Sequence, residues 1–196
     1  MARRNTSRYA VLGLLTWHPM SGYEIRKTYK DSVANFWSES FGQIYPILRQ
    51  LVEEGLSTRT VERREGRPDR HTYTVTDKGR EELLRWLAEP AEPRKERSEF
   101  MLKLFFGSQI PVAESIRHVR RAQKEREDLL ARLSAIKARL LSEHAGKVQL
   151  PYWLLTVTGG MAFCKAYIEW CDEAIAVFGK INKKKTGRGT KKGERK

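Results

Sequence analysis

The residues of this sequence best suited to recognise another molecule are four polar side chains on one face of a predicted helix. Within residues 40–56, apolar residues recur at steps of three and four, which predicts an amphipathic helix: Ile44, Leu48, Leu51 and Val52. The opposite face carries Gln43, Tyr45, Arg49 and Gln50. Side chains of these types can hydrogen-bond the edges of DNA bases or the phosphates.

The two ends of this helix carry different signals. Gly55 is expected to end it, because glycine is the usual residue after the last helical turn. At the other end, Ser40-x-x-Gln43 has the spacing of a capping box, which favours a start near residue 41. Pro46 suits only the first turn of a helix. The helix therefore either begins close to Tyr45 or bends there.

Two helices are expected before it. Residues 7–17 are apolar almost all round, which indicates a helix that is buried or takes part in a dimer interface. Ser21-x-x-Glu24 is a capping box that opens a second helix, reaching to about Asn35. Arg26 and Lys27 lie on its outer side, where they either face solvent or contact phosphates.

A β-hairpin and a fourth helix are expected after it. Residues 56–64 are rich in Thr, Val and Arg, residues 71–75 alternate with Tyr73 and Val75 on one side, and a Gly- and Pro-containing turn separates the two segments. Thr76 is expected to cap a helix whose apolar side holds Leu83, Leu84 and Leu87. Three helices followed by a hairpin form a winged helix-turn-helix. Arginines at the hairpin tip either face solvent or, as we prefer, contact DNA as a wing: Arg63, Arg64, Arg67 and Arg70.

Residues 8–87 resemble the DNA-binding domain of PadR-type transcriptional regulators. The match is carried, in order, by Gly22-Tyr23-Glu24-Ile25, Gln43-Ile44-Tyr45-Pro46-Ile47-Leu48, Gly66-Arg67-Pro68 and Tyr73-x-Val75-Thr76-x-x-Gly79. The resemblance implies that Tyr45 and its neighbours enter the major groove and that Arg67 marks the wing.

The second half is expected to be an antiparallel helical domain at residues 99–180, after a charged, proline-containing linker at 91–98. Residues 100–107 are densely apolar and predict a short buried helix. A long helix should run from Pro111 to about His144, and another from Pro151. The last helix has a seam with the spacing of a coiled coil: Leu154, Val157, Met161, Cys164, Ile168, Cys171, Ile175 and Phe178. Cys164 and Cys171 are too far apart to pair within one helix, so buried reduced thiols are expected.

This half resembles the helical dimerisation domain of the larger PadR regulators, through residues 99–107 and 169–174. In that family some members release DNA on binding phenolic acids or other aromatic compounds. Four aromatic side chains beside the seam either pack in the core or a dimer, or line a pocket for an aromatic effector: Trp153, Phe163, Tyr167 and Trp170.

Composition limits the other functions. The net charge of +14 favours an anionic partner, but half of it lies in residues 181–196, expected to be a disordered tail. No apolar stretch is long enough for a membrane span, so a cytoplasmic location is expected. Four scattered histidines and no metal-ligand or nucleophile cluster indicate neither an enzyme nor a metal or cofactor site. We expect a homodimeric, sequence-specific repressor; the alternative is a basic architectural protein that coats DNA without sequence preference.

Overall fold

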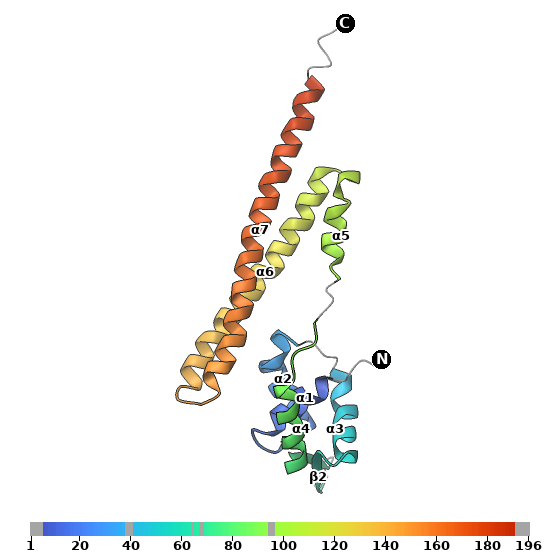
Figure 1. Ribbon diagram of the computed structural model, residues 1–196, viewed down its shortest axis with the longest axis vertical. Coiled ribbons are helices and arrows are strands. Elements are labelled where there is room, and N and C mark those ends of the chain that lie inside the picture. Colours follow the sequence, from blue (N-terminus) through green and yellow to red (C-terminus); the bar gives the residue numbers. More distant parts are fainter. Residues whose placement is uncertain (1–5, 38–40, 64, 67–68, 94–96, 191–196) are drawn as a thin grey trace. The chain divides into compact units, whose positions relative to one another are not determined.

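The structure is a computed structural model that describes residues 6–37, 41–63, 65–66, 69–93 and 97–190, without the side chains of residues 35, 41 and 183–190. It comprises two compact units, residues 1–94 and 95–196 (Figure 1). The division falls within the segment 91–98 that the sequence indicated as a linker.

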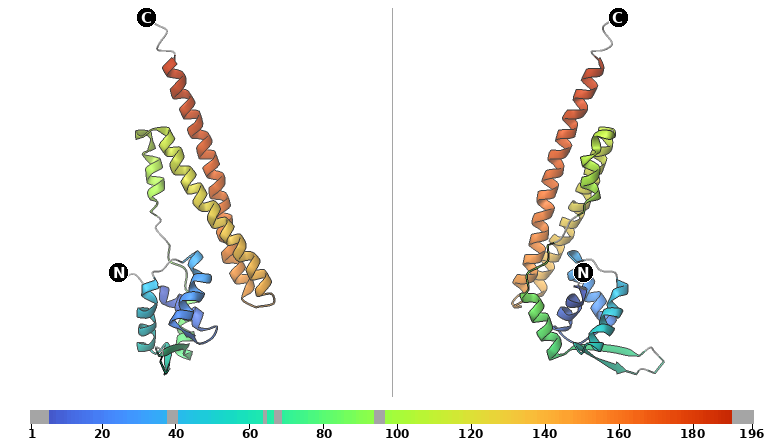
Figure 2. Two further views of the ribbon diagram at one scale, coloured as in Figure 1. Left: turned by 180° about the vertical axis from the view of Figure 1, so that it is seen from behind. Right: turned by 45° about the vertical axis from the view of Figure 1, so that its right-hand side comes forward.

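The first unit has four helices and a small antiparallel sheet. The helices are α1 (Ser7–Leu15), α2 (Gly22–Asp31), α3 (Ile44–Glu53) and α4 (Asp77–Ala88). Two 3₁₀ turns, Val33–Asn35 and Phe41–Gln43, lie between α2 and α3. The sheet has the strand order β1-β3-β2, with β1 at Met20–Ser21, β2 at Ser57–Glu62 and β3 at Arg70–Val75. In the right-hand view of Figure 2 the hairpin β2–β3 projects away from the helices.

The core of this unit forms around α1. Leu12, Ile25, Leu48 and Leu51 are completely buried, so α1, α2 and α3 present their apolar faces to one another. The apolar character of α1 on nearly every side is explained by its contacts with α2, α3 and α4. Burial of these side chains from water is the main stabilising contribution to such a domain.

Two details of the first unit differ from expectation. The sequence predicted a hairpin, but Met20–Ser21 adds a third strand by pairing with Tyr73 and Thr72 of β3. A two-residue strand is too short to show any periodicity, so no pattern could have revealed it. In α4, Leu83 is buried as predicted, whereas Leu84 and Leu87 are 66% and 62% exposed. Trp86 packs against the core instead, because α4 turns only one of its faces toward the core.

The second unit is built on a long helical hairpin. It contains α5 (Glu99–Phe105), a 3₁₀ turn (Gly107–Gln109), α6 (Val112–Glu143) and α7 (Leu150–Thr190). Gly146 has a φ of +81° in the short turn between α6 and α7, a conformation that glycine adopts without strain. The predicted seam is confirmed where Leu133 of α6 packs against Val157 and Cys164 of α7. Cys164 and Cys171 are buried and unbonded, and burial raises the pKa of the Cys171 thiol.

Two predictions for the second unit were wrong. The segment 100–107 was expected to be buried, but α5 has no buried residue, and Phe105 is 80% exposed. A helix this short packs on one side only, here through Phe100 against Tyr167 and Trp170. The tail was expected to lack structure from residue 181, whereas α7 continues to Thr190. Lysine is a good helix former, and extending an existing helix adds a hydrogen bond for each residue fixed.

Candidate nucleic-acid interface

Helix α3 carries the surface that the sequence singled out, and its start is now defined. A 3₁₀ turn leads directly into Ile44, and Pro46 is the third residue of the helix. Its missing N–H costs nothing there, because the first turn has no intrahelical acceptors for those groups. The helix therefore begins before Pro46 and does not bend at it. Ser40, the expected cap, lies outside the described residues, and Gln43 takes the N-cap position without a side-chain bond.

Burial divides α3 into two faces. Ile44, Ile47, Leu48 and Leu51 are buried in the core. Gln43, Tyr45 and Arg49 are exposed, with Tyr45 54% accessible. Arg49 also lines a hollow of about 230 Å³, together with Arg59 of β2 and Tyr73 of β3. Val52 and Glu53 of α3 complete the lining, so helix and hairpin border the same hollow.

The C-terminal end of α3 is fixed by backbone geometry. Gly55 has a φ of +72°, and its N–H donates to the carbonyl of Val52 at 3.0 Å. The N–H of Leu56 donates to the carbonyl of Leu51 at 2.8 Å. This pair of bonds is a Schellman motif, which confirms the predicted end of the helix at Gly55.

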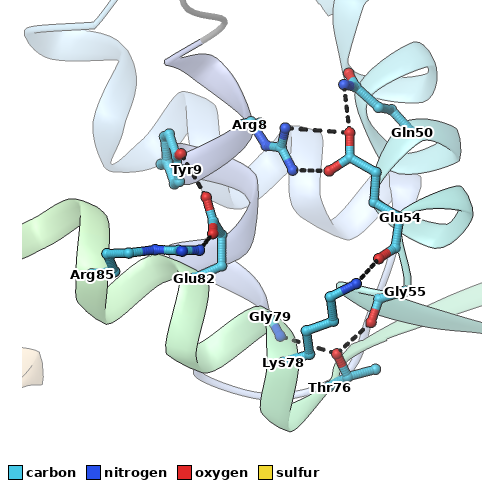
Figure 3. Close-up of polar contacts among 10 residues, drawn as sticks. All are labelled: Arg8, Tyr9, Gln50, Glu54, Gly55, Thr76, Lys78, Gly79, Glu82 and Arg85. Atoms are coloured by element: carbon cyan, nitrogen blue, oxygen red, sulfur yellow. Dashed lines mark hydrogen bonds and ion pairs between the residues drawn. The ribbon is translucent and has the colours of Figure 1, made fainter.

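Side chains from α1 and α4 clamp the same end (Figure 3). The two terminal guanidinium nitrogens of Arg8, Nη1 and Nη2, contact the carboxylate of Glu54. Lys78 Nζ donates to the Glu54 carbonyl at 2.8 Å. Thr76 Oγ1 donates to the Gly55 carbonyl at 2.8 Å. Burial raises the pKa of Glu54, but hydrogen bonds from Arg8 and Gln50 lower it by more, so the net shift is downward. The carboxylate therefore stays ionised and keeps the clamp charged.

Gln50 belongs to this clamp. Its amide donates to Glu54 Oε1 at 2.8 Å, and the side chain is only partly exposed. The sequence placed Gln50 on the outer face of the helix as a DNA contact, whereas the structure engages it within the chain. Arg8 and Lys78 carried no local signal in the sequence, because they approach Glu54 from 46 and 24 residues away.

A second set of contacts fastens α4 to α1. The rings of Tyr9 and Trp86 are stacked with centroids 4.4 Å apart, and Tyr9 Oη donates to Glu82 Oε1 at 2.8 Å. Arg85 forms an ion pair with Glu82 (Figure 3). Because α4 also supplies Lys78, contacts that fix α4 against α1 indirectly stabilise the Lys78 contact of the clamp.

The N-terminal end of α2 joins the helices to the hairpin. The predicted capping box is present: the Ser21 hydroxyl accepts from the Glu24 amide, and Glu24 accepts from the Ser21 amide at 2.8 Å. Arg70 Nη2, at the start of β3, donates to both carboxylate oxygens of Glu24 at 2.9 and 3.1 Å. Hydrogen bonds from Ser21, then the contact with Arg70, lower the pKa of Glu24 to about 2. Arg70, which the sequence predicted to contact DNA, anchors the hairpin to α2 through this ion pair.

The side chain of Tyr45 lies against this same turn. A Cβ atom built on Gly22 would be 2.6 Å from Tyr45 Cε1 and 3.3 Å from its hydroxyl oxygen. Such a contact is too close to exist, so the ring occupies space that only a glycine leaves open. The exposed aromatic residue of α3 is thereby held at the first residue of α2.

The remaining predicted DNA contacts are basic residues of α2 and of the hairpin tip. Arg26 and Lys27 are exposed on α2. Arg64 and Arg67, at the hairpin tip, lie outside the described residues. Arg63, next to them, is exposed.

The four aromatic residues proposed for an effector do not meet in one place. Tyr167 and Trp170 have centroids 5.4 Å apart, and Arg126 of α6 lies 4.9 Å over the Tyr167 ring. Trp153 is near the start of α7, in edge-to-face contact with His144. Phe163 is 81% exposed. Tyr167 and Trp170 therefore share one environment, and Trp153 lies apart from them.

Two properties of the described residues bear on other functions. Among the residues that the structure describes, no group of three or more His, Cys, Asp and Glu side chains could hold a metal ion. Within the same residues, no helix combines the length and the apolar character that a bilayer crossing requires.

Known proteins share both units. Residues 11–85 match the transcriptional regulator PadR-like family, and residues 96–178 match the family described as virulence activator alpha C-term. The negative transcriptional regulator PadR of Bacillus subtilis (strain 168) is 30% identical over 177 residues, which cover 88% of this chain and 97% of that protein.

Two crystal structures of Bacillus subtilis PadR are similar over the same length. The complex with operator DNA has a TM-score of 0.77 at 29% identity and covers 89% of this chain and 99% of that chain. The complex with p-coumaric acid has a TM-score of 0.74 at the same identity and the same coverage.

Proposed function

This chain belongs to the PadR-like family of transcriptional regulators, and we propose that it represses transcription by binding operator DNA as a homodimer. The observation that carries the proposal is the exposed face of α3, held at both ends by the rest of the unit. A rigid helix with polar outward side chains is what reading base edges in the major groove requires. Bacillus subtilis PadR, crystallised with operator DNA, supports the same use of this fold.

We assign the contacts by their placement. Gln43, Tyr45 and Arg49 face solvent on α3 and would approach bases. Arg26 and Lys27 on α2, together with Arg64 and Arg67 at the hairpin tip, would neutralise phosphates. We leave out Gln50 and Arg70, because each is engaged with a carboxylate of its own chain.

The proposed dimer rests on the apolar surface of the second unit. Phe105 of α5 and Leu155 and Phe163 of α7 are between 69% and 81% exposed in the single chain. Large exposed apolar side chains on both helices favour an interaction surface. A second copy would cover them, and a twofold dimer would present two α3 helices to the two halves of a palindromic operator.

We propose further that an aromatic carboxylic acid weakens operator binding. The related PadR has been crystallised with p-coumaric acid, which supports a ligand of this class. Tyr167 and Trp170, with the guanidinium of Arg126 beside them, are the candidate contacts, since they combine aromatic faces with a positive charge. A regulator of this kind works where the DNA is, so we place it in the cytoplasm, with a binding role and no catalytic one.

Selection from a random duplex library tests sequence specificity directly. The wild-type protein should enrich one palindromic sequence and bind it at least 10³-fold more tightly than random DNA, the range typical of specific regulators. p-Coumaric acid should weaken binding to that operator. Enrichment of no sequence would favour the architectural alternative.

Tyr45→Ala then tests whether the exposed face of α3 contacts bases. We expect operator affinity to fall about tenfold or more, the loss of one good base contact, with little change on random DNA. Sedimentation should still show a dimer. Leu84→Ala, which removes a side chain that is 66% exposed on α4, is the control and should bind normally. Equal loss on both DNAs would remove Tyr45 from the base-reading residues.

A further inference from the structure

We infer that Gly22 is a positioning residue for base recognition, because its missing side chain lets the Tyr45 ring lie on the first turn of α2. The inference rests on the proposed role of Tyr45. The close approach involves the far end of the ring: Cε1, Cζ and the hydroxyl oxygen lie 2.6, 3.2 and 3.3 Å from where a Cβ of residue 22 would be. Gly22 thus fixes where the polar tip of Tyr45 is held.

The first turn of α2 cannot move aside to admit a methyl group. Met20 and Ser21 immediately before it are paired with Tyr73 and Thr72 of β3. The capping box joins Ser21 to Glu24, and Glu24 is held in turn by Arg70. Backbone hydrogen bonds, a helix cap and an ion pair therefore fix this turn from both sides of residue 22.

Helix α3 cannot move aside either. Ile44, the neighbour of Tyr45, is 3% exposed and packed in the core. The other end of α3 is held by the Schellman motif at Gly55 and by Arg8 and Lys78. What remains free to move is the Tyr45 side chain, which is 54% exposed and has solvent into which it can rotate.

A methyl group at residue 22 should therefore act on recognition and not on folding. Rotation of an exposed side chain costs little stability, and alanine is a better helix former than glycine. The phenol, however, would leave the place from which it contacts a base, and hydrogen bonds weaken steeply with distance and angle. The expected signature is a loss of operator affinity in a fully folded protein.

The test is a double-mutant cycle on the full chain with the selected operator and a random duplex. Gly22→Ala should weaken operator binding about tenfold, the scale of one base contact, and leave binding to random DNA and the melting temperature unchanged. In the Tyr45→Ala background, Gly22→Ala should have no further effect. Gly13→Ala, in α1, is the matched control, because a Cβ there meets nothing within 4 Å; it should leave operator binding unchanged.

The outcomes separate the two proposals. If Tyr45→Ala loses operator preference but Gly22→Ala binds as the wild type does, or if the two losses add, the positioning role is overturned while the regulator proposal stands. If Tyr45→Ala leaves operator preference intact, the assigned role of Tyr45 fails, and the role of Gly22 fails with it. A lowered melting temperature for Gly22→Ala would show that the backbone yields instead of the ring, which also overturns the inference.

Discussion

At the scale of single residues, Glu24 shows how one carboxylate holds two elements together. It closes the capping box of α2 and binds Arg70 of β3, and the side chain is still 41% exposed. Its pKa falls from 4.5 to about 2 on folding, because both partners favour the charged form. A depressed pKa in the folded state means that the stabilisation is present above pH 4.5 and is lost as the pH falls toward 2.

Glu24→Gln should remove this dependence of stability on pH. At pH 7 we expect a loss of about 1 kcal/mol in the free energy of unfolding, allowing for solvent screening of an exposed pair. The difference from wild type should narrow progressively below pH 4.5, as urea denaturation at pH 7 and pH 3 would measure. Glu53→Gln, at an exposed position of α3, is the control. A difference that stays constant with pH would mean that the ionised carboxylate is not what stabilises this turn.

Residue types predicted the ends of helices well and side-chain pairings poorly. Ser21, Gly55 and Thr76 act as the sequence indicated, because a cap forms with residues only three or four positions away. Gln50 and Arg70 have the chemistry of DNA contacts, yet each donates to a carboxylate of its own chain, Gln50 to one four residues away and Arg70 to one 46 residues away. Chain pattern does not reveal which polar side chain a distant residue will engage.

At the scale of elements, the junction of α3, β2 and α4 depends on close backbone approach. A Cβ built on Gly79 would lie 2.1 Å from the carbonyl oxygen of Leu56, which also accepts from the Thr76 amide at 3.1 Å. Unlike the contact at Gly22, this one meets backbone, which cannot rotate away. The start of α4 can sit beside the end of α3 only because residue 79 has no side chain.

Gly79→Ala should therefore destabilise the protein, although alanine favours helices. We expect a loss of about 2–3 kcal/mol in the free energy of unfolding, the cost of forcing atoms into a packed site. Thermal and urea unfolding would measure it, with Gly13→Ala expected to be neutral or stabilising by up to about 1 kcal/mol. Unchanged stability in Gly79→Ala would show that α4 can shift without cost and does not constrain α3.

Periodicity predicted most elements but not how deeply they are buried. The helices, the hairpin and the α6–α7 seam follow from apolar spacing, which reports a preferred face. The exposure of α5 and the packing of the partly buried Trp86 against the core do not, because burial depends on what lies opposite the face. The third strand, β1, owes its existence to a partner more than 50 residues away.

At the scale of the whole molecule, half of the basic charge and the exposed face of α3 belong to different parts of the sequence. The exposed residues of α3 belong to the first unit, whose sequence is only mildly basic. Residues 181–196 carry eight lysines and arginines against one glutamate, which is half of the net charge of +14. Positive charge attracts phosphates whatever the sequence, whereas base contacts discriminate. Affinity and specificity should therefore be separable by truncation.

Deleting residues 181–196 should weaken binding to random DNA more than it weakens discrimination. If the segment contacts phosphates, its loss should lower the slope of log affinity against log salt by about 0.9 for each contact removed. Operator preference, set by Gln43, Tyr45 and Arg49, should persist at every salt concentration. Replacing the basic residues of 181–196 with glutamine in the full-length chain separates charge from length. A truncated protein that has lost its preference for the operator would show that the basic segment, and not α3, dominates recognition. An unchanged salt slope would show that the segment does not contact DNA.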